Sequence, residues 1–151
     1  MSRFDRSPPA AIARQPIHAM LVPFPIVCFT LTLLTDIAYW RTSYLMWQYF
    51  SEWLLLAGLV FGALAAIAGA IDFLLRWETR AAPHAWPHAI GGVVVLLLAF
   101  VNSLVHAGDG WTGVMPYGLA LSAVTVVVMM VTNWFGRAMV YRHGIGVSSH
   151  D

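Results

Sequence analysis

The sequence predicts an all-α integral membrane protein, a four-helix up-and-down bundle with its N- and C-termini on the cytoplasmic side. Of the 151 residues, 60% are hydrophobic and 10% are charged, and the mean hydropathy is +0.73. These values lie well outside the range of soluble domains. The net charge of +1 provides no basic patch for nucleic acid. Cys28 is the single cysteine, so no internal disulfide can form.

Four apolar stretches are each long enough to cross a bilayer, which takes about 20 residues at 1.5 Å of rise per residue. They run approximately over residues 18–39, 50–75, 88–107 and 118–140. A polar N-terminal segment, residues 1–17, precedes them and a short tail, residues 144–151, follows. We therefore expect a single domain over residues 18–143. No small-residue cleavage site follows the first stretch, so we expect it to be retained.

Arginine placement predicts the orientation of the bundle. Loops and termini on the cytoplasmic side of a membrane protein are enriched in Lys and Arg. One side of the predicted bundle carries Arg3, Arg6, Arg14, Arg76, Arg80, Arg137 and Arg142, whereas the other carries only Arg41. This asymmetry places both termini in the cytoplasm, as expected for a multi-pass protein in contact with the lipid bilayer.

Short connections, roughly ten residues each, predict that consecutive helices are antiparallel neighbours, so the first and third spans lie across the diagonal of the bundle. Small residues recur every four positions along the second span, at Gly58, Gly62, Ala66 and Ala70. Such a stripe lets another backbone or a flat ligand approach closely. It predicts helix packing within the chain, or a homo- or hetero-oligomer formed through this helix.

Ionisable residues inside membrane spans are candidates for function. Each predicted helix supplies one to a layer near the cytoplasmic side, namely His18, Asp72, His88 and His143. Two histidines from diagonal helices suit a b-type haem, with His88 and either His18 or His143 as ligands. The three histidines also suit a divalent metal such as zinc or iron. A structural or lipid-headgroup role is the third interpretation, and Asp72 is spaced to pair with Arg76.

A second polar layer lies near the other side of the membrane and comprises Asp36, Glu52, Asn102 and His106. It is separated from the first layer by about 18 residues, or roughly 27 Å of helix rise, so the two layers form separate sites. Asp36 lies at the C-terminal end of its helix, where the dipole disfavours a negative charge, and Arg41 or His106 is expected to compensate. Glu52 is expected in a first helical turn capped by Ser51.

Two prolines interrupt the first span. Pro23 and Pro25 each remove a backbone donor, and a bend there would set the direction in which His18 points.

Motifs along the chain resemble a bacterial four-helix membrane family known as domain of unknown function 2231. Its members typically read HPMLVxFPI in the first helix, G-small-x-D at the end of the second, a histidine opening the third and WLGGxLVYRHGVGV at the close. The matching positions here are His18, Pro23, Pro25, Gly69, Asp72, His88, Trp134, Gly136, Tyr141, His143, Gly144 and Gly146. Ala19, Arg137 and Ala138 depart from the pattern.

The resemblance implies a fold, a location in a bacterial inner membrane and, through the redox modules that accompany some members, a role in membrane redox chemistry. We therefore expect an electron-transfer subunit that holds haem b and passes electrons between a redox partner protein and the quinone pool. Asp72 is expected to tune the charge near the haem. The alternative is a non-catalytic anchor or assembly protein with a structural polar or metal site. No nucleophile and base pair is recognisable, so no catalytic residue is assigned and an enzymatic activity is left open.

Overall fold

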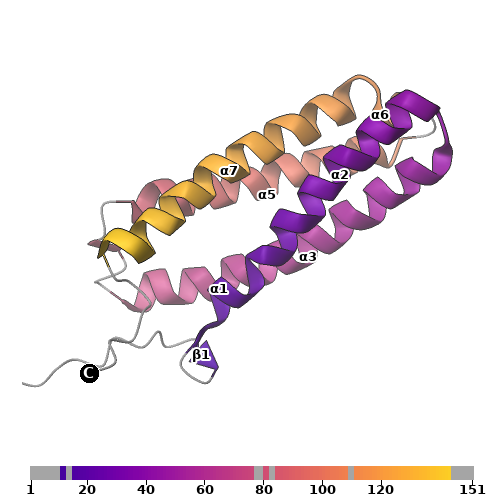
Figure 1. The fold of residues 1–151 in the computed structure, drawn as a ribbon. Coiled ribbons are helices and arrows are strands. Elements are labelled where there is room, and N and C mark those ends of the chain that lie inside the picture. The colour runs from indigo at the N-terminus through magenta and orange to yellow at the C-terminus, as the bar shows by residue number, and fades with distance from the viewer. Residues whose placement is uncertain (1–10, 13–14, 77–79, 82–83, 109–110, 144–151) are drawn as a thin grey trace, which may run out of the picture.

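The computed structural model describes residues 11–12, 15–76, 80–81, 84–108 and 111–143 (Figure 1). Within these residues the chain is helical apart from one small hairpin. The strands are β1 (Ala11–Ile12) and β2 (Gln15–Pro16), which pair antiparallel. The helices are α1 (Ile17–Leu21), α2 (Pro23–Thr42), α3 (Leu45–Leu75), α5 (Ala85–His106), α6 (Trp111–Val114) and α7 (Tyr117–His143).

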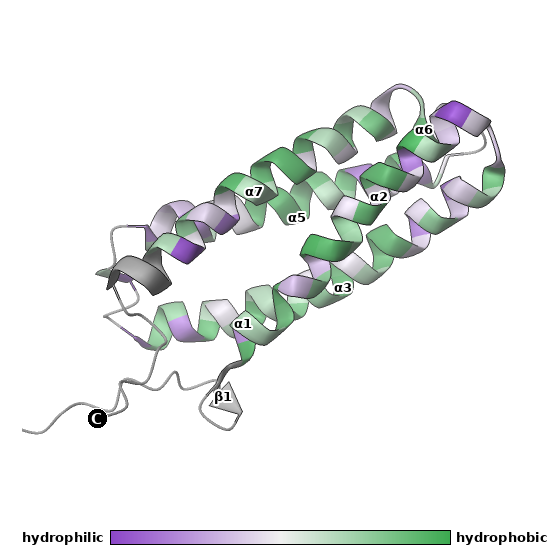
Figure 2. Cartoon of the chain, in the orientation of Figure 1, coloured by the Kyte–Doolittle hydropathy of each residue, from purple (hydrophilic) through white to green (hydrophobic). Residues whose placement is uncertain are grey.

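Four helical segments are long and apolar enough to cross a membrane, in agreement with the four predicted spans. They cover Ile17–Thr42, Leu45–Leu75, Ala85–His106 and Trp111–Ala138. Figure 2 shows their central turns to be mostly hydrophobic, with hydrophilic residues gathered toward the ends. The chain is therefore a membrane-spanning protein in contact with a lipid bilayer.

The connection between α2 and α3 is much shorter than predicted. Only Ser43 and Tyr44 separate the two helices, because α3 begins at Leu45 and not near residue 50. Ser43 has a left-handed backbone, with φ of 57°, and its N–H donates to the carbonyl of Tyr39 at 2.7 Å. That contact ends α2 and reverses the chain within two residues. The aromatic and polar residues before position 50 read as a loop in the sequence, but they form the first turns of α3.

The long helices form the predicted up-and-down bundle (Figure 1). Helix α2 packs against α3 and α7, and α5 packs against the same two helices. Helices α2 and α5 therefore lie across the diagonal, as expected for the first and third spans. The short helix α1 extends the first span and packs along α3. Consequently the start of the first span, the last turns of α3 and α7 and the first turns of α5 share one end of the bundle.

All four long helices contribute to one hydrophobic core. Its buried members are Phe29, Leu55, Val95, Ala99, Val126 and Met129. Large apolar side chains also cover the outside of the bundle, and Trp53 is 70% exposed while Leu75 is 69% exposed. An outer surface of this kind suits hydrocarbon better than water, which agrees with the membrane assignment.

The small-residue stripe of the second span serves packing within the chain over its first half. A Cβ added at Gly58 would collide with the ring of Phe29 on α2, and one added at Gly62 would lie 2.6 Å from Cδ2 of Leu96 on α5. Ala66 and Ala70, farther along α3, are exposed. The glycines thus let α2 and α5 approach α3 closely.

We predict that Gly58→Ala destabilises the protein by about 1–3 kcal/mol, the usual cost of overpacking a filled core. Gly92→Ala is the matched control, because a Cβ at Gly92 meets nothing within 4 Å. Thermal unfolding of both variants in detergent checks the difference, and equal melting temperatures would contradict the packing.

Burial is uneven along the bundle. The buried residues of α3 all lie at or before Ala68, and none of its last seven residues, through Leu75, is buried. Helix α1 has no buried residue, and α5 has none between Ala85 and Val95. Among the described residues, the end of the bundle that carries His18 and His88 is therefore packed less densely than the rest.

Candidate functional site

The two prolines of the first span separate α1 from α2 but do not turn the chain away from the bundle. Val22, between the helices, has helical angles of −54° and −37°, and its N–H donates to the carbonyl of His18 at 3.1 Å. Pro23 and Pro25 have no N–H to continue the pattern. The resulting short first helix packs on α3 and places His18 against it.

His18 and His88 face each other across the diagonal of the bundle, and we call them the imidazole pair. Their ring centroids lie 5.8 Å apart with an interplanar angle of 86°. The Nδ1 of His18 donates to the carbonyl of Ala65 at 2.8 Å, and the Nδ1 of His88 donates to the carbonyl of Thr132 at 3.0 Å. A carbonyl only accepts, so each Nδ1 carries the proton and each Nε2 of a neutral ring carries a lone pair.

A glycine lies behind each ring of the imidazole pair. A Cβ at Gly69 of α3 would approach Nδ1 of His18 to 2.9 Å, and a Cβ at Gly136 of α7 would approach Cε1 of His88 to the same distance. Each glycine therefore provides the space that the neighbouring ring occupies. Larger residues at these positions would displace the imidazoles.

Asp72, a third residue of the predicted layer, does not join the imidazole pair in the described structure. The Oδ1 of Asp72 is buried and has no hydrogen-bond partner there. No ion pair links Asp72 to Arg76, so the expected i,i+4 pair is not formed; only the backbone N–H of Arg76 donates to the Asp72 carbonyl, at 3.1 Å. The His143 side chain lies outside the described residues.

Across the described side chains, no group of three or more His, Cys, Asp and Glu residues is placed to hold a metal ion. Of the predicted metal ligands His18, His88 and His143, the structure describes the side chains of the first two. These two supply two nitrogen lone pairs. A zinc site in a protein ordinarily takes three or four protein ligands.

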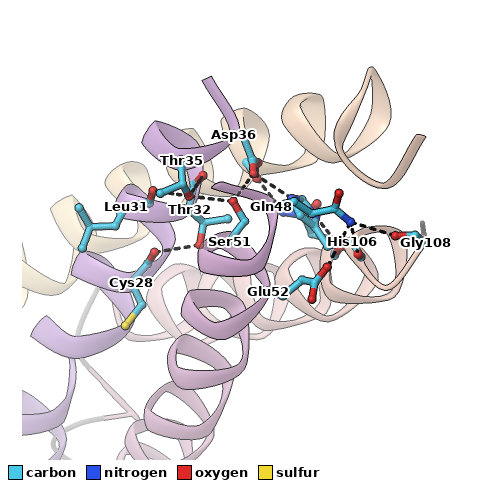
Figure 3. Close-up of polar contacts among 12 residues, drawn as sticks. Cys28, Leu31, Thr32, Thr35, Asp36, Gln48, Ser51, Glu52, His106 and Gly108 are labelled. Atoms are coloured by element: carbon cyan, nitrogen blue, oxygen red, sulfur yellow. Dashed lines mark hydrogen bonds and ion pairs between the residues drawn. The ribbon is translucent and has the colours of Figure 1, made fainter. Parts of the chain in front are cut away.

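A second cluster occupies the opposite end of the bundle (Figure 3). It joins all four long helices, and we call it the Asp36 network: Asp36, Ser51, Asn102, His106 and Ser122. All five are at most 2% exposed, and Asp36 and His106 are fully buried. Asp36 Oδ1 accepts from Ser51 at 2.6 Å and from Nε2 of His106 at 2.9 Å. Its Oδ2 accepts from Ser122 at 2.5 Å.

Hydrogen-bond roles fix the protons in this network. His106 Nδ1 faces the carbonyl of Asn102 at 3.0 Å, so this nitrogen must donate. A single proton then lies between His106 Nε2 and Asp36, and the two residues together carry no net charge. Two serine hydroxyls donate to the carboxyl, which favours a carboxylate beside an imidazolium. Asp36 is thus a buried, paired charge that ties four helices together.

The sequence anticipated part of this network and missed the rest. Asp36 pairs with His106, one of its two expected partners; Arg41, the other, lies over the Trp40 ring at 5.7 Å. Ser51 is not a helix cap, because α3 begins six residues earlier, at Leu45. Glu52, expected in the same first turn, accepts instead from Nε2 of Gln48 at 3.2 Å.

The partners Ser51, Ser122 and Gln48 were not recognised from the sequence. Serine is common in membrane helices. Its hydrogen-bond partner depends on which face of the helix it occupies, and the sequence does not reveal that face. The Gln48 amide also donates to the carbonyls of His106 and Gly108, at 3.4 and 3.0 Å. In the sequence, the indication of such a polar contact was a glutamine within an otherwise apolar and aromatic stretch.

The fold and the two polar clusters define a four-span helical membrane protein with a buried ion pair at one end and a diagonal imidazole pair at the other. The chain belongs to the family described as "Predicted membrane protein (DUF2231)", whose model matches residues 14–149. This confirms the resemblance seen in the sequence motifs. Comparisons with curated proteins and with solved structures gave no match.

Proposed function

We propose that this protein is a b-type haem electron-transfer subunit of a bacterial inner membrane, with His18 and His88 as the two axial ligands. The observation that carries the proposal is the imidazole pair itself. Its two rings come from diagonal helices, both Nδ1 atoms are held by backbone carbonyls, and neither Nε2 has a hydrogen-bond partner among the described residues. Histidine ligands of metals characteristically donate their second nitrogen to a carbonyl or carboxylate in this way.

The spacing of the rings fits two ligands on one iron. Imidazole nitrogens bind transition metals at about 2.0–2.1 Å, so two rings on opposite sides of one ion have centres roughly 6 Å apart. The observed 5.8 Å is close to that separation. Haem needs only two protein ligands because the porphyrin supplies the other four nitrogens. A two-histidine set therefore suits haem better than a bare zinc or iron ion.

The surroundings of the imidazole pair also favour a flat apolar group. The residues of α3 beyond Ala68 and the first turns of α5 are poorly buried in the bundle. The turns around the imidazole pair therefore bury few side chains against one another. Asp72, one turn beyond Gly69 on the same face of α3, brings an unpartnered carboxyl oxygen to this region.

Bound haem supplies reversible one-electron chemistry. The chain's own residues would hold it: His18 and His88 would donate their Nε2 lone pairs, the carbonyls of Ala65 and Thr132 fix the ring tautomers, and the apolar helices would exclude water. Arginine placement supports an orientation with this end near the cytoplasmic face. The subunit would pass electrons between a redox partner protein and the quinone pool.

Absorption spectroscopy of the detergent-purified protein tests this proposal. After growth with a haem precursor, or after titration with haemin, we expect a Soret band that shifts on dithionite reduction and one haem per chain. A colourless preparation that takes up no haemin would overturn the proposal.

The Asp36 network favours a second candidate function, a non-catalytic membrane anchor. It joins all four helices without involving the imidazole pair, so it can stabilise the bundle whether or not a cofactor binds. A stably folded, colourless protein that copurifies with another membrane protein would support this candidate.

A further inference from the structure

We propose that Gly69 and Gly136 are positioning residues that hold the planes of the two axial imidazoles perpendicular to each other. This inference rests on the proposed function, because it concerns the ligand field of the iron that His18 and His88 would bind. It goes beyond ligand identity: it states which residues set the orientation of the ligands, and what spectroscopic class of haem results.

Each imidazole is positioned by one hydrogen bond and by the space that a glycine without a Cβ leaves for the ring. His18 donates from Nδ1 to the Ala65 carbonyl at 2.8 Å and lies against Gly69, one turn farther along α3. His88 donates from Nδ1 to the Thr132 carbonyl at 3.0 Å and lies against Gly136, one turn farther along α7. The same arrangement, a carbonyl and a glycine four residues later, therefore holds both rings.

A hydrogen bond to a fixed carbonyl sets the direction of each Nδ1. The ring can occupy its position because the neighbouring glycine has no Cβ. A methyl group at Gly69 would lie 2.9 Å from Nδ1 and 3.2 Å from Cε1 of His18. One at Gly136 would lie 2.9 Å from Cε1 and 3.0 Å from Nδ1 of His88. The 2.9 Å contact in each variant is shorter than real Cβ contacts, so the ring must turn or shift.

The two rings so held make an angle of 86°. Because each axial imidazole interacts with the iron orbital perpendicular to its own plane, perpendicular ligands affect two iron orbitals equally. Those orbitals then stay nearly equal in energy, and ferric low-spin haem shows a strongly anisotropic EPR signal with one large g value. Parallel planes separate the orbitals and give a rhombic, three-line signal. Orientation of axial ligands by their surroundings is one of the protein's means of tuning a haem.

EPR of the ferric haem-loaded full chain tests the inference. Wild-type protein should show the single large-g signal. Gly69→Ala and Gly136→Ala should each retain a bis-histidine absorption spectrum but shift the largest g value downward, toward a rhombic signal. Gly92→Ala is the matched control: it lies on the same helix as His88, and its added Cβ meets nothing within 4 Å, so its EPR signal should equal that of wild type.

The outcomes separate the two proposals. Protein without haem overturns the proposed function, and this inference with it. Haem-loaded wild type with a rhombic signal overturns the perpendicular arrangement alone, and this result needs no variant to fold. A large-g signal that survives unchanged in both glycine variants overturns the positioning role of Gly69 and Gly136. A shift in both variants and none in Gly92→Ala supports it.

Discussion

A His106→Leu variant is expected to lose about 3–5 kcal/mol of unfolding free energy, the typical cost of removing one partner from a buried ion pair. Asp36 would keep its two serine donors but would lose the group that balances its charge. Asp36 lies six residues before the end of α2 at Thr42, so the helix dipole, which acts within the last turn, adds little to this loss. Chemical unfolding in detergent, followed by tryptophan fluorescence, measures the effect.

A double-mutant cycle identifies the cause. Asp36→Asn should cost much less, roughly 1 kcal/mol, because an amide can donate to a neutral His106 whose Nδ1 still donates to the Asn102 carbonyl. The double variant Asp36→Asn/His106→Leu should be more stable than His106→Leu alone, since no buried charge is left unpaired. If the second substitution brings no recovery, the ion pair is not what holds these helix ends together.

Loss of haem is the second large effect, expected in both His88→Ala and His18→Ala. Each variant removes one of the two proposed nitrogen ligands and its hydrogen bond to the neighbouring helix. A single remaining ligand leaves the iron without its sixth ligand. We therefore expect the reduced-minus-oxidised spectrum of a six-coordinate b-type haem to disappear, and haemin affinity to fall by at least 10–100-fold, the range seen for weakened metal sites.

His84→Ala is the matched histidine control, because His84 lies one turn before His88 and its ring is 5.7 Å from that of Phe135. It should keep the spectrum. His143→Ala decides between the two ligand sets that the sequence left open. Loss of the spectrum in His143→Ala together with its retention in His18→Ala would assign the second ligand to α7 and contradict the pair seen in the structure.

Much of the fold was predictable from the sequence, because membrane spans are set by hydropathy and length alone. The diagonal relation of the first and third spans followed from short connections. The start of α3 was not predictable, since the aromatic and polar residues between Tyr44 and Phe50 suit an interfacial helix and an interfacial loop equally. A left-handed Ser43 carries no marker in the sequence, because glycine is the residue expected there.

The candidate sites were predictable only as individual residues. Depth along a helix follows from residue number, so the two polar layers and their separation could be derived. Rotation of each helix about its axis could not, because a nearly uniform apolar surface gives almost no periodic signal. For that reason Ser51 and Ser122 were missed as partners of Asp36. The expected Asp72–Arg76 pair failed for a similar reason: helical spacing permits the contact but does not enforce it.

Ferric haem-loaded protein examined by near-infrared magnetic circular dichroism tests the central claim most directly, since the energy of its charge-transfer band identifies the two axial ligands. Our account requires the band of low-spin iron with two neutral imidazoles, one from His18 and one from His88. A five-coordinate high-spin haem, a different ligand pair, or a folded protein that binds no haem would contradict it.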